Sequence, residues 1–285
     1  MRLARQLLRV AALAGLAVAG AAPAQAPTPG ADAQELVHKV IARELAEGEK
    51  PRPYIYRLRR EGPEGSWTRD IVDTREGLVS RLIASNDRPA SLEERAKDER
   101  HLERLLQDPG EQRKRKERQE KDAEQVRKLL RALPDAFLYD YAGTEPGPHG
   151  DLLRLKFRPN PQFDPPSRET IVYKGMEGTM MVEPRDLRVV RIDATLFEDV
   201  TLGWGLLARL HKGGRFTLEQ SLLPDGNWET TRMTLDFSGR AFLFKTLRIQ
   251  SKQSISDFRP APANLSLAEA IELLKKQDAA VAERK

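Results

Sequence analysis

The stretch Thr231-Arg232-Met233-Thr234-Leu235-Asp236-Phe237 decides the fold, because mostly apolar side chains alternate with polar ones along its whole length. Successive side chains of a β-strand point to opposite faces, so this period of two is typical of a strand with one buried face. The run from Phe216 to Leu222 alternates in the same way, and Pro224-Asp225-Gly226-Asn227 between the two runs has turn chemistry. The sequence here predicts an antiparallel hairpin.

Further strands are predicted on both sides of this hairpin. No helical pattern interrupts the chain from Gly178 to Phe258, so the sheet should be antiparallel and should meander. Ser238-Gly239-Arg240 is interpreted as a turn before a long last strand. The other predicted strands are Tyr54–Arg59, Trp67–Val72, Gly77–Ser85, Phe137–Tyr141, Leu153–Arg158, Arg188–Ala194 and one or two within Val200–Leu210.

Helices are predicted before, within and after the strand regions. The first begins at Asp32, with Glu35 completing a capping box, and ends at Gly48. Residues 91–133 break the strand pattern and predict a helical hairpin that starts at Ser91 with Glu94 and stops at Leu133-Pro134-Asp135. Shorter helices are predicted from Ser167 to Met176 and over residues 266–280, the latter capped by Ser266 and Glu269.

These patterns predict an α+β fold: a strongly curved antiparallel β-sheet, or half-open barrel, with helices on the concave side and an inserted charged helical hairpin. Sheets with this many strands curl, and a helix laid in the curve would bury the apolar face. We expect a single domain over residues 32–285 that contains the 91–133 insertion and the 266–280 helix, because strands on both sides of the insertion can build one sheet.

The N-terminus has the features of a cleavable export signal. Arg2, Arg5 and Arg9 precede an apolar run from Val10 to Ala22, and Ala22-Pro23-Ala24 is a small-residue cleavage site. The sequence predicts a signal peptide over residues 1–24, cut after Ala24, and a flexible linker over residues 25–31. An uncleaved membrane anchor is the alternative, although the apolar run is short for a membrane span. A periplasmic location and no stable membrane insertion after cleavage are expected.

Composition excludes several classes of function. The 285-residue chain has no cysteine, which excludes disulfides, thiolate metal sites and a lipoprotein-type signal. Three of the five net positive charges leave with the signal peptide, so the mature chain is near +2, too little to argue for nucleic-acid binding. The four histidines show no metal-ligand spacing, and no nucleophile or phosphate-loop motif occurs. We predict no catalytic residue, no metal site and no cofactor.

The aromatic and large apolar residues at alternating strand positions are the candidate binding residues. They have two interpretations, a packed core or the lining of an apolar cavity on the concave face, and both need the same residue types. The predicted cavity lining is Tyr54, Tyr56, Phe137, Tyr139, Leu155, Phe157, Trp204, Phe216, Met233, Leu235 and Phe237. The charged stretch from Gln112 to Asp122 likewise has two interpretations, a solvated helix with internal ion pairs or a basic patch for acidic partners.

The order of these elements resembles the LolA-like and LolB-like superfamily of periplasmic lipoprotein-localisation proteins, in its uncharacterised exported branch. The stretch from Gly178 to Ile192 resembles that family's strand, Pro/Asp turn and strand ending in an apolar–Arg–apolar step. Gly203-Trp204-Gly205, Lys212-Gly213-Gly214 and Asn227-Trp228 are similar to exported members. The resemblance covers most of the mature chain but contains no invariant motif, and the charged hairpin departs from the compact carriers.

The resemblance implies a half-open sheet that holds the acyl chains of lipoproteins in an apolar cavity. The expected function is therefore a non-enzymatic periplasmic carrier or binder of a lipidated protein or another apolar ligand. The alternative is an envelope protein–protein interaction or lipid-sensing regulatory module that uses the charged helical hairpin, and another envelope protein is then the partner. An exported enzyme is a third hypothesis.

Overall fold

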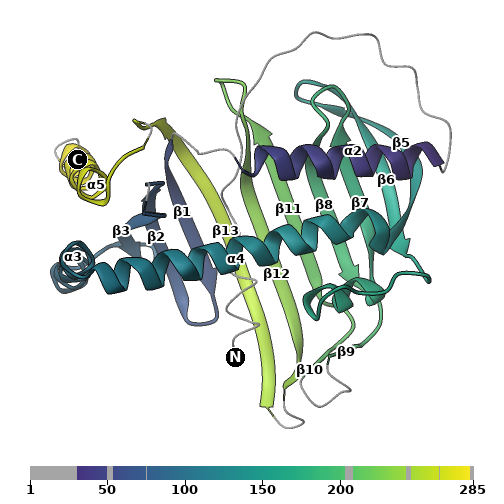
Figure 1. Ribbon diagram of the computed structural model, residues 1–285, viewed down its shortest axis with the longest axis horizontal. Coiled ribbons are helices and arrows are strands. Elements are labelled where there is room, and N and C mark those ends of the chain that lie inside the picture. Colours follow the sequence, from purple (N-terminus) through teal and green to yellow (C-terminus); the bar gives the residue numbers. More distant parts are fainter. Residues whose placement is uncertain are drawn as a thin grey trace. The chain divides into compact units, whose positions relative to one another are not determined.

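The fold is α+β, built on a large open antiparallel sheet (Figure 1). The computed structural model describes residues 31–49, 54–74, 76–202, 208–241, 245–262 and 264–282. Hydrogen bonds connect the strands in the order β4-β3-β2-β1-β13-β12-β11-β8-β7-β6-β5, and β10 pairs with β12 and β9. The end strands β4 and β5 do not pair with each other, so the sheet is curved but not closed. The predicted signal peptide lies outside the described residues.

The strands agree closely with the alternating runs of the sequence. The early strands are β1 (Tyr54–Gly62), β2 (Gly65–Val72), β3 (Val79–Ser85) and β4 (Arg88–Pro89). The middle strands are β5 (Phe137–Gly147), β6 (Gly150–Pro159), β7 (Met176–Glu183), β8 (Arg188–Leu196), β9 (Val200–Leu202) and β10 (Ala208–Leu210). The last strands are β11 (Arg215–Leu222), β12 (Trp228–Ala241) and β13 (Lys245–Pro260). In the predicted hairpin, Phe216 lies opposite Leu235 and Leu218 opposite Met233.

The chain divides into two compact units. Of the described residues, those up to position 49 and from 125 to 250 form unit 1, and those from 54 to 124 and from 251 to 282 form unit 2. Two elements pass from one unit to the other, the helix α4 (Pro109–Ala136) and the strand β13. Each unit has its own apolar core. The single-domain boundaries expected from the sequence stay a prediction.

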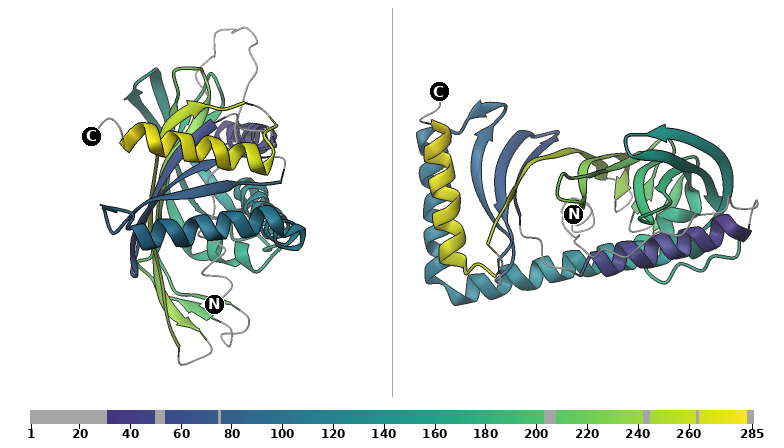
Figure 2. Two further views of the ribbon diagram at one scale, coloured as in Figure 1. Left: turned by 90° about the vertical axis from the view of Figure 1, so that its left-hand side faces the viewer. Right: turned by 90° about the horizontal axis from the view of Figure 1, so that it is seen from above.

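In unit 1, helices cover one face of the sheet. The helix α2 (Ala31–Glu47) and the second half of α4 both lie against strands of this unit (Figure 1). The view from above shows that the sheet curls around the side on which α2 lies (Figure 2). The short 3-10 helix η1 (Glu169–Gly175) packs beside β6, β7 and β9. The concave face of unit 1 is thus the covered one.

In unit 2, the helices α3 (Leu92–Gln107) and α5 (Leu267–Ala282) pack against each other and against β3. Their shared core includes Ile55, Val79, Leu102 and Ile271, all nearly inaccessible to water. The two helices of the predicted insertion are present. In Figure 1, α3 is viewed end-on whereas α4 lies in the plane, so α3 runs crosswise to the first half of α4.

The predicted capping residues were right for two helices and wrong for one, and the short helix predicted from Ser167 begins at Glu169. Ser91 accepts a hydrogen bond from the Glu94 amide while Glu94 accepts one from the Ser91 amide, which is a complete capping box. Ser266 and Glu269 make the same exchange before α5. Asp32 is not a cap, because α2 has already begun at Ala31 and Asp32 lies in its first turn.

Two predicted boundaries need correction. The helix α4 continues through Pro134 to Ala136, because proline at this point removes only one hydrogen bond and Pro134 itself is buried. Ser238-Gly239-Arg240 is not a turn, because β12 continues to Ala241. A Cβ atom on Gly239 would lie 2.2 Å from the carbonyl oxygen of Arg209 in β10, so this glycine serves a close approach between strands.

Candidate functional site

The concave face of unit 1 carries one continuous apolar cluster. Its buried strand residues come from eight strands, β5 to β10, β12 and β13. The longer strands place every second side chain on this face. Seven of the eleven predicted binding residues belong to this cluster and are nearly inaccessible to water: Phe137, Tyr139, Leu155, Phe157, Met233, Leu235 and Phe237. Met180 on β7 and Ile192 on β8 fill the space between them in the sheet. The sequence therefore located the apolar face of this unit.

Aromatic rings make up one end of this cluster. The Phe137 ring centroid lies 4.8 Å from that of Phe157 and 5.2 Å from that of Tyr173, and Tyr139 also contacts both phenylalanines. These four rings pack against one another in the space between β5, β6 and η1. A ligand that entered here would have to displace the helices that cover them.

Two helices complete the cluster from the open side. The helix α2 contributes Ala33, Val37, Val40 and Ile41, spaced to form one apolar stripe, and α4 contributes Ala132 and Ala136. These six side chains pack against the apolar side chains of the strands. The covering is thus of the kind that an apolar ligand could replace.

Two tyrosines hold α4 in place by hydrogen bonds to its carbonyl groups. Tyr139 donates to the Leu133 carbonyl at 3.0 Å, and Tyr173 donates to the Leu129 carbonyl at 3.2 Å. Burial raises the pKa of both phenols above the ordinary tyrosine value, because ionisation would place a charge where water cannot reach it. Tyr173 was not among the predicted residues, because it lies in the short helix instead of an alternating strand.

One buried ion pair joins α2 to the sheet. The Glu44 carboxylate accepts hydrogen bonds from Arg188 Nη2 at 3.0 Å, from the Val189 amide at 3.0 Å and from Gln220 Nε2 at 3.3 Å. The exposed fraction of the side chain is 5% for Arg188 and 9% for Glu44. We call Glu44, Arg188 and Gln220 the α2 clamp. Sequence reasoning missed it, because 144 positions separate Glu44 from Arg188.

The remaining predicted residues lie elsewhere. Tyr54 and Tyr56 are buried in unit 2, where both rings contact Phe258. Phe216 is half-buried and packs against the unit 1 cluster. Trp204 lies outside the described residues. The structure thus brings eight of the predicted residues together in unit 1 and leaves two apart.

Other kinds of site were also considered. No group of three or more His, Cys, Asp or Glu side chains within the described ranges is arranged to hold a metal ion. Among the same residues, no helix is long and apolar enough to cross a membrane.

The comparisons with known proteins are distant. No family model matches the chain, and no curated protein matches its sequence. Two solved structures are similar, and the first is a DUF1329 family protein from Desulfovibrio piger, with 12% identity and a TM-score of 0.30 over 83% of this chain and 94% of that one. The second is a putative outer membrane lipoprotein-sorting protein domain from Vibrio parahaemolyticus, with 10% identity and a TM-score of 0.29 over 85% of this chain and 98% of that one. TM-scores this low assign the chain to neither family.

Proposed function

We propose that this chain is a non-enzymatic periplasmic binder or carrier of an acyl chain or a similar apolar ligand. The concave face of unit 1 supports the proposal: it carries an apolar cluster from eight strands, covered by α2 and the second half of α4, with one buried ion pair to α2. The ligand would replace the apolar stripe of α2 on the strands. The predicted export signal supports a periplasmic location.

The apolar stripe of α2 and an acyl chain gain free energies of similar size when they are buried on the strands. Burial of Val37, Val40 and Ile41 on α2 contributes about 5–9 kcal/mol, at about 1.5–3 kcal/mol for each side chain. An acyl chain with about 14 methylene groups gains roughly 11 kcal/mol on burial, at about 0.8 kcal/mol for each group. An exchange between such balanced occupants is reversible, which suits a carrier that must also release its ligand.

Fluorescent fatty-acid binding to two matched variants tests this proposal. Met233→Lys would place a charge within the proposed ligand space, whereas Thr234→Lys places the same charge at the neighbouring half-buried position of the same strand, on the opposite face. We expect saturable binding to the wild type and to Thr234→Lys, with loss of binding in Met233→Lys.

Folding must be checked, because a lysine in the cluster also destabilises it. Met233→Leu keeps the volume and the apolar character of the position, so it should fold and retain binding. The proposal fails if the wild-type protein binds no fatty acid, or if all three variants bind it equally well.

The alternative partner-binding function rests on the solvent-facing side of α3. Leu92 is 87% exposed at the start of this helix, and Lys97, Arg100 and Arg104 border a surface hollow of about 450 Å³. Glu103 and Gln107 also line this hollow, so three of its five lining residues are cations. An exposed leucine and a mainly cationic hollow on one helix fit a partner that presents an apolar and acidic surface. If fatty-acid binding is absent, Leu92→Ser and Arg100→Glu are the first variants to test for loss of an envelope partner.

A further inference from the structure

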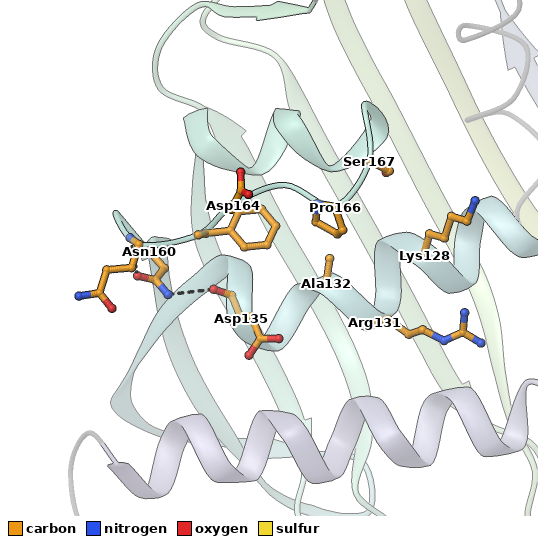
Figure 3. A pocket seen from close by; sticks show the side chains of 10 residues that line it. Lys128, Arg131, Ala132, Asp135, Asn160, Asp164, Pro166 and Ser167 are labelled. Atoms are coloured by element: carbon orange, nitrogen blue, oxygen red, sulfur yellow. Dashed lines mark hydrogen bonds between the residues drawn. The ribbon is translucent and has the colours of Figure 1, made fainter.

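A second hollow lies in unit 1, away from the apolar cluster's interior. It has a volume of about 670 Å³ and lies between the second half of α4 and the loop from Asn160 to Ser167 (Figure 3). Volumes of about 300–1,000 Å³ are usual for small-ligand sites. The hollow is therefore large enough for a small ligand. Neither the sequence patterns nor the proposed acyl binding assigns it a role.

The loop that forms one wall is fixed to the end of α4. Asn160 Nδ2 donates to the Asp135 carbonyl at 3.0 Å, and the Asn160 amide donates to the Ala136 carbonyl at 2.9 Å. Its side-chain oxygen accepts from the Gln162 amide at 3.0 Å, and Pro161, Pro165 and Pro166 stiffen the rest. Asn160 thus occupies the free carbonyl groups at the helix end, and the wall is preorganised.

The charges along the hollow are separated by sign. Lys128, Arg131 and Asp135 are spaced by three and four residues, so they share one face of α4 over about 10 Å. Figure 3 shows Lys128 and Arg131 toward one end of the hollow, and Asp135 and Asp164 toward the other. The C-terminal end of a helix carries partial negative charge, which adds to that of the two aspartates. The hollow therefore has a cationic end and an anionic end.

Each end of the hollow has one charged side chain that is available to a ligand, Lys128 at the cationic end and Asp164 at the anionic end. Within the described residues, Lys128 and Asp164 have no hydrogen bond or ion pair, and Asp135 faces His38 on α2 at 3.7 Å. Ser167, at the cationic end, has a hydroxyl group without a partner in the same part of the chain. The buried Phe163 and Ala132 supply apolar surface between the ends.

We propose that this hollow binds a short zwitterionic peptide of two or three residues. Its carboxylate would lie at Lys128, Arg131 and Ser167, and its ammonium group at Asp135 and Asp164. An extended chain spans about 3.3–3.6 Å per residue, so three residues match the roughly 10 Å over which the charges change sign. The apolar surface between the ends would accept small side chains, and this site functions independently of the proposed acyl binding.

Calorimetric titration of the mature chain with Ala-Ala-Ala tests the proposal. Three ligands are compared: the free peptide, its N-acetylated form and its C-amidated form. We expect the free peptide to bind with a Kd of about 1 mM or tighter, and each blocked form to bind at least about tenfold more weakly, because each lacks one charge-assisted contact.

Two variants assign the ends separately. In Lys128→Ala the difference in Kd between the free and the amidated peptide should become smaller. In Asp164→Ala the difference in Kd between the free and the acetylated peptide should become smaller. Lys114→Ala is the control, since this exposed lysine lies on the same helix but outside the hollow. Both affected positions are exposed, so the variants should fold, and thermal unfolding verifies this.

Three results would overturn the proposal. The first is no heat of binding at about 1 mM free peptide. The second is equal affinity for free and blocked peptides, or differences that persist in Lys128→Ala and Asp164→Ala. The third is stronger binding of glycerophosphoethanolamine, a zwitterion with closer charges, than of the tripeptide.

Discussion

Removal of the Glu44 carboxylate should release α2 from the sheet without unfolding unit 1. In Glu44→Ala, Arg188 loses the carboxylate that pairs with it while its side chain stays 5% exposed, and the Val189 amide loses an acceptor. Removal of one member of a buried ion pair costs about 3–5 kcal/mol, because the other charge is left without compensation. The opening of α2 should become easier by that amount.

Hydrogen–deuterium exchange of α2 measures this opening directly. A change of about 3 kcal/mol corresponds to exchange that is faster by roughly a hundredfold or more. Amides from Val37 to Glu47 should accelerate in Glu44→Ala and, by less, in Glu44→Gln, which keeps a hydrogen-bond acceptor. Amides of β6 and β7 should stay protected, because their core contacts are unchanged.

The matched control is Glu35→Ala on the same helix. Glu35 pairs with Lys39 one turn away, and both side chains are more than half exposed. Exposed pairs of this kind contribute about 0.3–0.5 kcal/mol, so the control should exchange about twofold faster at most. If Glu44→Ala accelerates α2 no more than Glu35→Ala does, the α2 clamp does not hold this helix.

Three further predictions concern stability. Gly239→Ala should destabilise the protein by about 1–3 kcal/mol in urea unfolding, because its Cβ meets the Arg209 carbonyl, whereas Ser238→Ala should be near neutral; equal midpoints would refute the close-approach argument. Burial raises the pKa of Tyr139 in the folded protein above its value in the unfolded chain. The neutral phenol therefore contributes fully to the free energy of unfolding below the unfolded tyrosine pKa, and this contribution is lost as the pH rises above about 10. Tyr139→Phe should flatten this alkaline loss, and an unchanged pH profile would contradict it. Asp70 is 4% exposed and accepts hydrogen bonds from Arg57 and Arg259, so Asp70→Ala should destabilise unit 2 by about 2–4 kcal/mol, measured by exchange of β1 and β2, with no change at β7.

The strands could be predicted because their information is local. Phe216 to Leu222 and Thr231 to Phe237 alternate residue by residue, and the structure pairs them in the expected hairpin. The capping box at Ser91 is equally local, since it depends on two residues three positions apart. Patterns of this kind need no knowledge of the rest of the chain.

The rest depends on neighbours that are distant in sequence. Ser238-Gly239-Arg240 has the composition of a turn. A glycine occurs within β12 because β10 lies so close to it that a side chain would not fit. The α2 clamp joins a helix residue to a strand residue 144 positions later. The hollow between α4 and the loop from Asn160 to Ser167 depends on the contact of Asn160 with the end of α4, which the composition of neither segment indicates.

Native mass spectrometry with lipid extraction, on the chain expressed with its signal peptide and purified in mature form, tests the central proposal most directly. We predict a co-purifying acyl lipid or lipidated protein at one molecule per chain, which Met233→Lys loses and Thr234→Lys retains. A ligand-free mass, together with no uptake of fluorescent fatty acid on titration, would contradict the proposed function and would leave the charged surface of α3 as the candidate binding site.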